Sequence, residues 1–213
     1  MFKTIKNALK TPEVRKKLLY TLLLIVIFRL GCYITIPGVD SVTVSDQMKA
    51  ASNGVTGLID TISGGAFSRL SIFAMSITPY ITASIVIQLL GMVIPSLERL
   101  VKEGGEEGKT KVNKYTKILT VILALIEGLG VFFSYNSTGI LLDTGFLGGF
   151  LTVLSLMTGT ALLIWLGEQI TNKGIGNGIS MLIFVGIIAG LPKGITAVWK
   201  LIFVDGAFST VGL

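Results

Sequence analysis

The sequence contains no histidine and a single cysteine, and only 14% of its 213 residues are charged. The absence of histidine removes the commonest general base and the commonest metal ligand. One cysteine, Cys32, allows neither a disulfide framework nor a thiolate metal site, and its position inside a hydrophobic run predicts a buried thiol. Because no nucleophile motif is present either, we expect no enzyme activity, no cofactor and no metal.

The chain contains few charged residues and several long hydrophobic runs. Hydrophobic residues make up 51% of the sequence and the mean hydropathy is +0.79, well above the balance of a soluble domain. A run of about 20 apolar residues is long enough to cross a bilayer as a helix. We therefore predict an all-α polytopic membrane protein with five transmembrane helices, at about 18–36, 72–94, 118–135, 147–170 and 179–204.

Two of these predicted helices are irregular in composition. The run 72–94 contains a proline and five polar residues, which indicates a helix that lines a wet cavity or another helix. The run 179–204 is expected to break at residues 192–194, which read Pro-Lys-Gly. Before that break, Gly186 and Gly190 form a GxxxG face suited to close helix contact.

The N-terminal residues 1–17 carry six Lys and Arg residues and place three apolar residues on one helical face. We predict that they form a cytoplasmic amphipathic helix on the membrane surface. A secretory signal peptide is the alternative. The hydrophobic run that follows extends to Ile36, contains Arg29 and shows no small-residue cleavage site, so we expect it to be retained as the first transmembrane helix.

The basic residues indicate the orientation of the chain. If the N-terminus is cytoplasmic, the inside segments hold 13 Lys and Arg residues, including six in the predicted loop 96–117, and the outside segments hold four. The positive-inside rule therefore predicts a cytoplasmic N-terminus, and it accounts for the basic residues without nucleic-acid binding. The GGEEGKT stretch of the loop lacks the spacing and the preceding strand of a phosphate-binding loop, so we expect a solvated turn there.

Three features leave alternatives open at this stage. Residues 54–69 are too short and glycine-rich to span a bilayer, and they fit either a re-entrant, plug-like short helix or a surface loop with a helical turn. Arg29, inside the first run, either snorkels to the interface or forms a structural ion pair. Glu127, inside the third run, is either a functional carboxylate or a protonated or hydrogen-bonded structural residue.

Seven short stretches of the sequence carry a resemblance to a known family. They read FRLG at 28–31, IPGVD at 36–40, SGGAFSR at 63–69, PYITASI at 79–85, QLL at 88–90, LGEQIT at 166–171 and GIGNGIS at 174–180. Together they resemble the SecY family, the protein-conducting channel of the Sec translocon. The resemblance implies that this chain is one half of an inverted-repeat ten-helix channel, with a re-entrant plug helix at 54–69.

The resemblance also implies roles for single residues. The second and third transmembrane helices would form one side of a lateral gate, with Thr82, Gln88 and Glu127 near the seam. Isoleucines four residues apart share a helix face, and a ring of them would exclude water and ions by dewetting. The implied pore ring consists of Ile77, Ile81, Ile183 and Ile187. The implied plug consists of Thr56, Gly57, Leu58, Ile59, Asp60, Thr61, Ile62, Ser63, Gly64 and Gly65.

The implied function is that of a pore-forming subunit, which passes unfolded secretory proteins across the bacterial inner (plasma) membrane and membrane helices laterally into it. The implied partners are a SecE-like clamp subunit, a SecG-like subunit, the motor ATPase SecA or a ribosome, secretory precursors with their signal sequences, the lipid bilayer, and a C-terminal half of the channel in the same or another chain. Two alternatives stay open: half of a dimeric secondary transporter with Glu127 as ion or proton site, and a non-conducting scaffold fragment.

Overall fold

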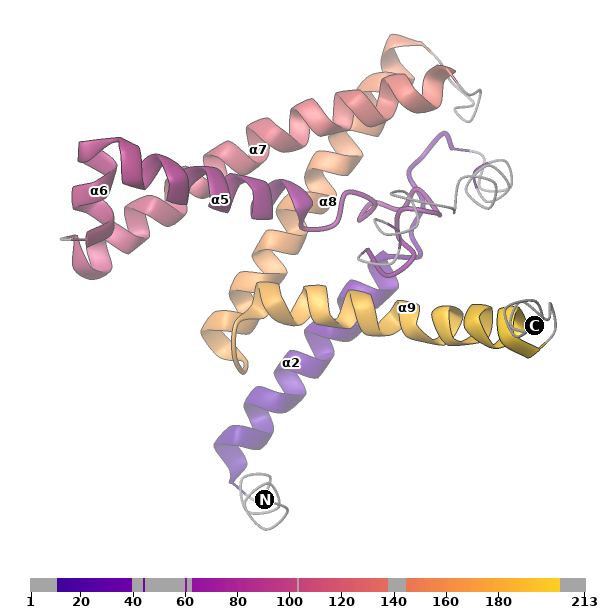
Figure 1. The fold of residues 1–213 in the computed structure, drawn as a ribbon, viewed down its shortest axis with the longest axis horizontal. Helices are drawn as coiled ribbons and strands as arrows, with labels where there is room; N and C mark the ends of the chain where they lie inside the picture. The colour runs from indigo at the N-terminus through magenta and orange to yellow at the C-terminus, as the bar shows by residue number, and fades with distance from the viewer. Residues whose placement is uncertain are drawn as a thin grey trace, which may run out of the picture.

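The computed structural model describes residues 11–39, 44, 60, 63–102, 104–137 and 145–203, and over these ranges the chain consists of six helices without a strand (Figure 1). This confirms the predicted all-α fold class. Most of the predicted amphipathic segment 1–17 lies outside the described residues. The helices are α2 (Pro12–Gly31), α5 (Thr78–Val93), α6 (Pro95–Lys102), α7 (Gly105–Ser137), α8 (Phe146–Lys173) and α9 (Gly178–Phe203).

The helices differ in their fitness to cross a membrane. Of the helices described, α7 and α8 are long and apolar enough to do so. Helix α5 and the portion 178–192 of α9 are apolar but shorter. The five predicted spans therefore stay a prediction, although each of them overlaps one of the helices.

The prediction of one continuous helix over 72–94 is wrong at its start. Helix α5 begins at Thr78, with Pro79 in its first turn. Proline lacks the N–H that a residue inside a helix donates, so Pro79 fits a helix start and not a helix interior. Upstream of it, Ser76 and Leu70 have φ angles of 53° and 44°, in the left-handed region that a right-handed helix does not use.

The predicted cytoplasmic loop 96–117 is mostly helical, which corrects the expectation of an irregular stretch, and its location stays a prediction. Helix α6 and the first turns of α7 occupy this range, and the chain reverses between them (Figure 1). The two helices approach each other so closely at this reversal that an added Cβ at Gly108 would lie 2.1 Å from the Leu100 carbonyl oxygen. Only glycine therefore fits at position 108. Surface ion pairs between Lys109 and Glu106 and between Lys111 and Glu107 support the start of α7, and Lys111 lowers the pKa of the Glu107 carboxyl.

Helix α9 corrects a third prediction. It runs without a break from Gly178 to Phe203, with Pro192 inside it. A proline inside a helix removes one backbone hydrogen bond, but apolar helices of membrane proteins tolerate this loss when neighbouring groups satisfy the freed carbonyl. The expected break at 192–194 does not occur.

Small residues determine how the helices pack. Figure 1 shows α7 running beside α5, while α8 crosses from this pair towards α2 and α9. Close packing through small side chains is typical of helices in membranes, where the hydrophobic effect does not hold helices together. The buried stripe of α5 consists of Pro79, Ala83, Ile87 and Gly91, and that of α7 includes Thr116, Thr120, Ala124 and Gly128.

An irregular stretch, residues 63–77, lies at the centre of the fold, and we call it the docked segment. Ala66, Phe73 and Ile77 belong to a core formed with α2, α8 and α9. Leu70 and Ala74 belong to a second core formed with α7 and α8. A stretch without regular secondary structure thus supplies side chains to both cores.

Candidate functional site

The docked segment pairs with the chain that follows α2. The N–H of Ile36 donates to the carbonyl oxygen of Leu70 at 3.0 Å, and the N–H of Ile72 donates to that of Ile34 at 2.9 Å. These two bonds flank an isolated antiparallel bridge between Thr35 and Ser71. They satisfy backbone groups that a helix would otherwise satisfy internally, which a buried non-helical stretch requires.

Side chains strengthen this docking from both sides of the bridge. The guanidinium of Arg69 lies 4.3 Å from the centre of the Tyr33 ring, in a cation–π contact. The rings of Phe28 and Phe73 stack with centroids 5.9 Å apart. Gly31 makes room for this stack, because an added Cβ there would lie 2.1 Å from the Phe73 ring. Residues 66–77 are therefore held firmly against the end of α2.

The start of the docked segment lies between two helices. Arg29 of α2 donates from Nη1 to the carbonyl oxygen of Gly64 at 3.0 Å. An added Cβ at Gly64 would lie 2.6 Å from that nitrogen and 3.2 Å from Cα of Gly186 in α9. The sequence predicted that the face of α9 with Gly186 would contact another helix. In the structure, Gly186 instead contacts the non-helical backbone at Gly64. The sequence did not predict that Arg29 would donate to a backbone carbonyl.

Asp60 accepts three hydrogen bonds from residues on both sides of Gly64. The carboxylate Oδ1 of Asp60 accepts from the N–H of Ser68 at 2.7 Å, and its carbonyl accepts from the N–H of Gly65 at 2.8 Å. The hydroxyl of Ser63 also donates to the Asp60 carbonyl, at 3.0 Å. Of the predicted plug residues, Asp60, Ser63, Gly64 and Gly65 are thus seen. Residues 56–59, 61 and 62 lie outside the described residues.

The four isoleucines of the predicted pore ring fall into two pairs. Ile77 is only 2% exposed and lies in one hydrophobic core with the partly buried Ile183. Ile81 and Ile187 are 37% and 40% exposed. Ile77, the residue before α5, and Ile183 of α9 therefore pack inward, while Ile81 and Ile187, four residues further along the chain, present surface. Their role in a pore stays a prediction.

The three residues predicted for a lateral gate lie on the neighbouring helices α5 and α7, but no hydrogen bond joins them. The hydroxyl of Thr82 donates to the Thr78 carbonyl at 3.1 Å, and the amide of Gln88 donates to the Ser84 hydroxyl at 3.2 Å, so both bonds stay within α5. Glu127 is half-buried on α7 and forms no hydrogen bond or ion pair with the part of the chain that the structure describes. Its carboxyl is therefore available to a partner group.

Two polar contacts join helices α7 with α8 and α2 with α8, and the sequence did not predict them. Lys117 of α7 and Glu168 of α8 form an ion pair at 2.5 Å, with side chains 44% and 37% exposed. The hydroxyl of Tyr20 in α2 donates to Gln169 at 3.3 Å. Charges at the ends of two predicted helices on the same side of the membrane were the signal that could have suggested the ion pair.

The turn between α8 and α9 is attached to the same end of α2. The hydroxyl of Thr21 accepts from the N–H of Ile175 at 3.1 Å. An added Cβ at Gly174 would lie 2.4 Å from this hydroxyl oxygen, and one at Gly178 would lie 1.9 Å from the Gly167 carbonyl oxygen. Gly174 therefore admits α2 to the turn, and Gly178 lets the start of α9 pack closely on α8.

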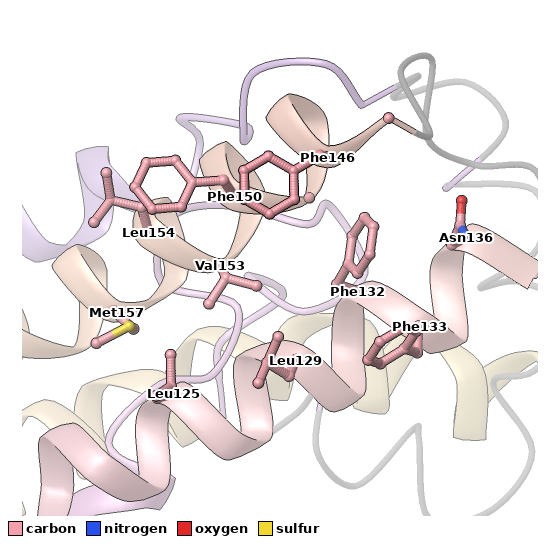
Figure 2. Close-up of a pocket in the computed structure, with 12 residues that line it drawn as sticks. Leu125, Leu129, Phe132, Phe133, Asn136, Phe146, Phe150, Val153, Leu154 and Met157 are labelled. Atoms are coloured by element: carbon pink, nitrogen blue, oxygen red, sulfur yellow. The ribbon is translucent and has the colours of Figure 1, made fainter.

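An apolar groove of about 530 Å³ runs between α7 and α8 (Figure 2). Figure 2 shows Leu125, Leu129 and Phe132 of α7 facing Val153 and Phe150 of α8. Such a lining suits an apolar group and offers no chemistry for catalysis. Among the described residues no group of three His, Cys, Asp or Glu side chains could hold a metal ion.

Comparisons with known proteins agree on one family. The SecY family model matches residues 71–213. The protein translocase subunit SecY of Staphylococcus carnosus is 43% identical over 215 residues, which cover 99% of this chain and 49% of that protein. The subunit of the same name from Bacillus subtilis is 42% identical over 96% of this chain and 47% of that protein. The chain thus spans about half the length of the curated relatives it matches.

Solved structures show the same fold. A protein-conducting channel matches with a TM-score of 0.58 and 21% identity, over 81% of this chain and 36% of that chain. A SecY channel described for its plug domain matches with a TM-score of 0.58 and 20% identity, over 94% of this chain and 42% of that chain. At this identity the likeness establishes the fold and leaves the residue roles to other arguments.

Proposed function

Because the chain belongs to the SecY family, we propose that it supplies half of the pore-forming subunit of a protein translocation channel. The channel would pass unfolded secretory proteins across the membrane and membrane helices laterally into it. The docked segment is the observation that carries this proposal. A buried, non-helical stretch between α2, α8 and α9 suits a channel wall that bears a displaceable plug.

In this proposal the seal consists of the pore ring and the plug together. Ile81 and Ile187 present surface that the remaining part of the channel would face. Isoleucine side chains form no hydrogen bonds with water, so a narrow ring of them would exclude water and ions. The same ring could widen around a passing polypeptide. The plug, residues 56–65, would cover this ring from the outer side.

We place the protein in the bacterial plasma membrane with its N-terminus in the cytoplasm. The 13 Lys and Arg residues on the predicted inside segments support this orientation. The contacts of Lys117 with Glu168 and of Tyr20 with Gln169 agree with the prediction that all four residues lie on one side of the membrane.

The proposed partners are those of a translocon. A SecE-like clamp, a SecG-like subunit and the other half of the channel would cover apolar surface that α2, α5 and α9 expose. A SecA-like motor or a ribosome would drive transport. One matching structure is Sec61 in a canine ribosome–channel complex, and this match supports a ribosome as a candidate partner.

The relatives also bear on the alternatives. The relatives named above are translocase subunits and protein-conducting channels, which makes the chain a relative of transport proteins and favours a channel over a scaffold. A dimeric small-solute transporter would need a chemical role for Glu127. That alternative depends on the Glu127 carboxyl, which has no partner among the residues that the structure describes.

Proteoliposomes that hold the channel complex containing this chain can separate the two. We expect a radiolabelled precursor to become protected from protease when a motor and ATP are added, and this protection to persist in Glu127→Gln. A small-solute uptake that Glu127→Gln abolishes, without any protection of precursor, would instead establish the transporter.

A further inference from the structure

The boundary between the plug and the docked segment has its own fixing point. Residues 66–77 are held by hydrogen bonds and ring contacts to residues 28–36. At Gly64, the last but one residue of the plug, the Arg29 side chain supplies a hydrogen bond from α2. Gly64 and Gly65 have φ angles of 67° and 84°, which glycine adopts freely, so the chain changes direction there.

This bond is stronger than an ordinary backbone contact. Arg29 is charged and half-buried on α2, and Gly64 and Gly186 are both buried. A charged donor that binds a carbonyl oxygen in a poorly hydrated place gains more than a neutral donor does. A guanidinium at this depth also needs an oxygen to replace its lost water. Displacing the plug would therefore leave the Arg29 guanidinium and the Gly64 carbonyl oxygen without this hydrogen bond.

We propose that Arg29, together with Gly186 behind Gly64, is a positioning residue that latches the plug in the closed channel. This inference rests on the proposed function. Opening then requires the Arg29–Gly64 bond to break, and a signal sequence must supply the free energy for it. A closed state that loses such a bond becomes less populated by about tenfold, given the usual strength of hydrogen bonds to charged groups.

The test uses the whole channel complex in planar bilayers and in proteoliposomes. Arg29→Met removes the donor, and Arg29→Lys keeps a charged donor. Gly64→Ala places a Cβ against Arg29 and Gly186. Gly38→Ala is the matched control, because Gly38 has a φ angle of 80° but an added Cβ there would meet no atom within 4 Å.

We expect Arg29→Met and Gly64→Ala to raise the resting ion leak by about tenfold and to admit precursors with weakened signal sequences. Arg29→Lys should restore most of the seal, and Gly38→Ala should leave it unchanged. A purely structural role would lower the yield of complex and the transport of every precursor alike, without a leak. That pattern would overturn the proposal.

The latch and the proposed function fail in different ways. If precursors with intact signals cross while Arg29→Met leaves leak and selectivity unchanged, the latch is refuted and the channel stands. If no precursor crosses through the unmodified complex, the proposed function itself is refuted. Should Arg29→Met fail to assemble, an equal leak in Gly64→Ala and Gly38→Ala would refute the latch.

Discussion

Glycine residues decide where the backbone of this molecule approaches a helix. Gly159 of α8 faces the docked segment, and an added Cβ there would lie 2.0 Å from the carbonyl oxygen of Ile72. The obstacle is a backbone atom, which cannot rotate away as the end of a side chain can. The docked segment therefore needs glycine at this position.

We predict that Gly159→Ala destabilises the complex by roughly 1–3 kcal/mol, the usual cost of overpacking. Thermal unfolding of the detergent-solubilised complex would measure this. Gly130→Ala is the matched control, because Gly130 lies in α7 with no atom within 4 Å of an added Cβ. Alanine is the better helix former, so this control should be neutral or stabilising. Equal stability of the two variants would contradict the packing argument.

The exposed isoleucines carry a second prediction at this scale. Replacing Ile81 and Ile187 by glycine in the assembled channel removes apolar bulk from the proposed ring and should raise ion conductance at rest. Planar-bilayer recordings would measure the change. Ile85→Gly, at an exposed position one turn further along α5, serves as control. Unchanged conductance in the double variant would remove both residues from the pore.

Sequence motifs located these residues but could not supply their contacts. The stretches FRLG and SGGAFSR indicated a plug and a first helix, and nothing in them states that Arg29 reaches Gly64. A side chain that binds a backbone carbonyl needs no complementary side chain, so the sequence contains no second residue from which the bond could be predicted. The ion pair of Lys117 with Glu168 was missed for a related reason, since it depends on how two long helices cross.

At the scale of elements, the irregular segment and not a helix is central. Hydropathy alone predicted a helix from residue 72, because residues 72–77, the last part of the docked segment, carry no charge and continue into an apolar run. The structure uses the same apolar side chains in a non-helical path and satisfies the backbone through residues 34–36. The beginning of α5 at Thr78 could have been predicted from Pro79, which fits only a first turn.

Deletion of Thr56–Gly65 should loosen the seal and relax the selectivity for signal sequences, because it removes the proposed plug and leaves residues 66–77 docked. Resting conductance and transport of precursors with defective signals would measure the two effects. If the deletion leaves both properties at wild-type values, residues 56–65 do not form a plug.

The ion pair between α7 and α8 offers a prediction about two elements. A double-mutant cycle with Lys117→Met and Glu168→Gln should give a coupling of about 0.2–1 kcal/mol, because both side chains are partly exposed and screened. Exchange of the charges, Lys117→Glu with Glu168→Lys, should recover most of the stability that either single reversal loses. A coupling of zero would show that the pair does not join the helices.

At the scale of the whole molecule, the predicted all-α fold and the family are confirmed, and the number of spans is not yet tested. Composition was sufficient to predict the all-α fold, because apolar runs of this length form helices in a membrane and few alternatives satisfy their backbone groups. It was insufficient for the stretch 96–117, where polar residues were read as a loop and form helix. Polarity predicts exposure, and an exposed stretch is often helical.

The exposed apolar faces are the surfaces through which this chain would join the proposed channel. Helices α2, α5 and α9 each present large hydrophobic side chains, which a bilayer or the rest of the channel would cover. The chain matches about half the length of its relatives, so in our proposal the rest of the channel would complete the pore beside this chain.

Photo-crosslinking from position 81 tests the central claim most directly. A probe replaces Ile81 in the channel complex, a secretory precursor is stalled during transport in native membranes, and a probe at Trp165, exposed on α8, serves as control. Our account predicts a crosslink from position 81 to the precursor and from position 165 to lipid. A probe at position 81 that reaches only lipid, while the precursor still crosses the membrane, would contradict it.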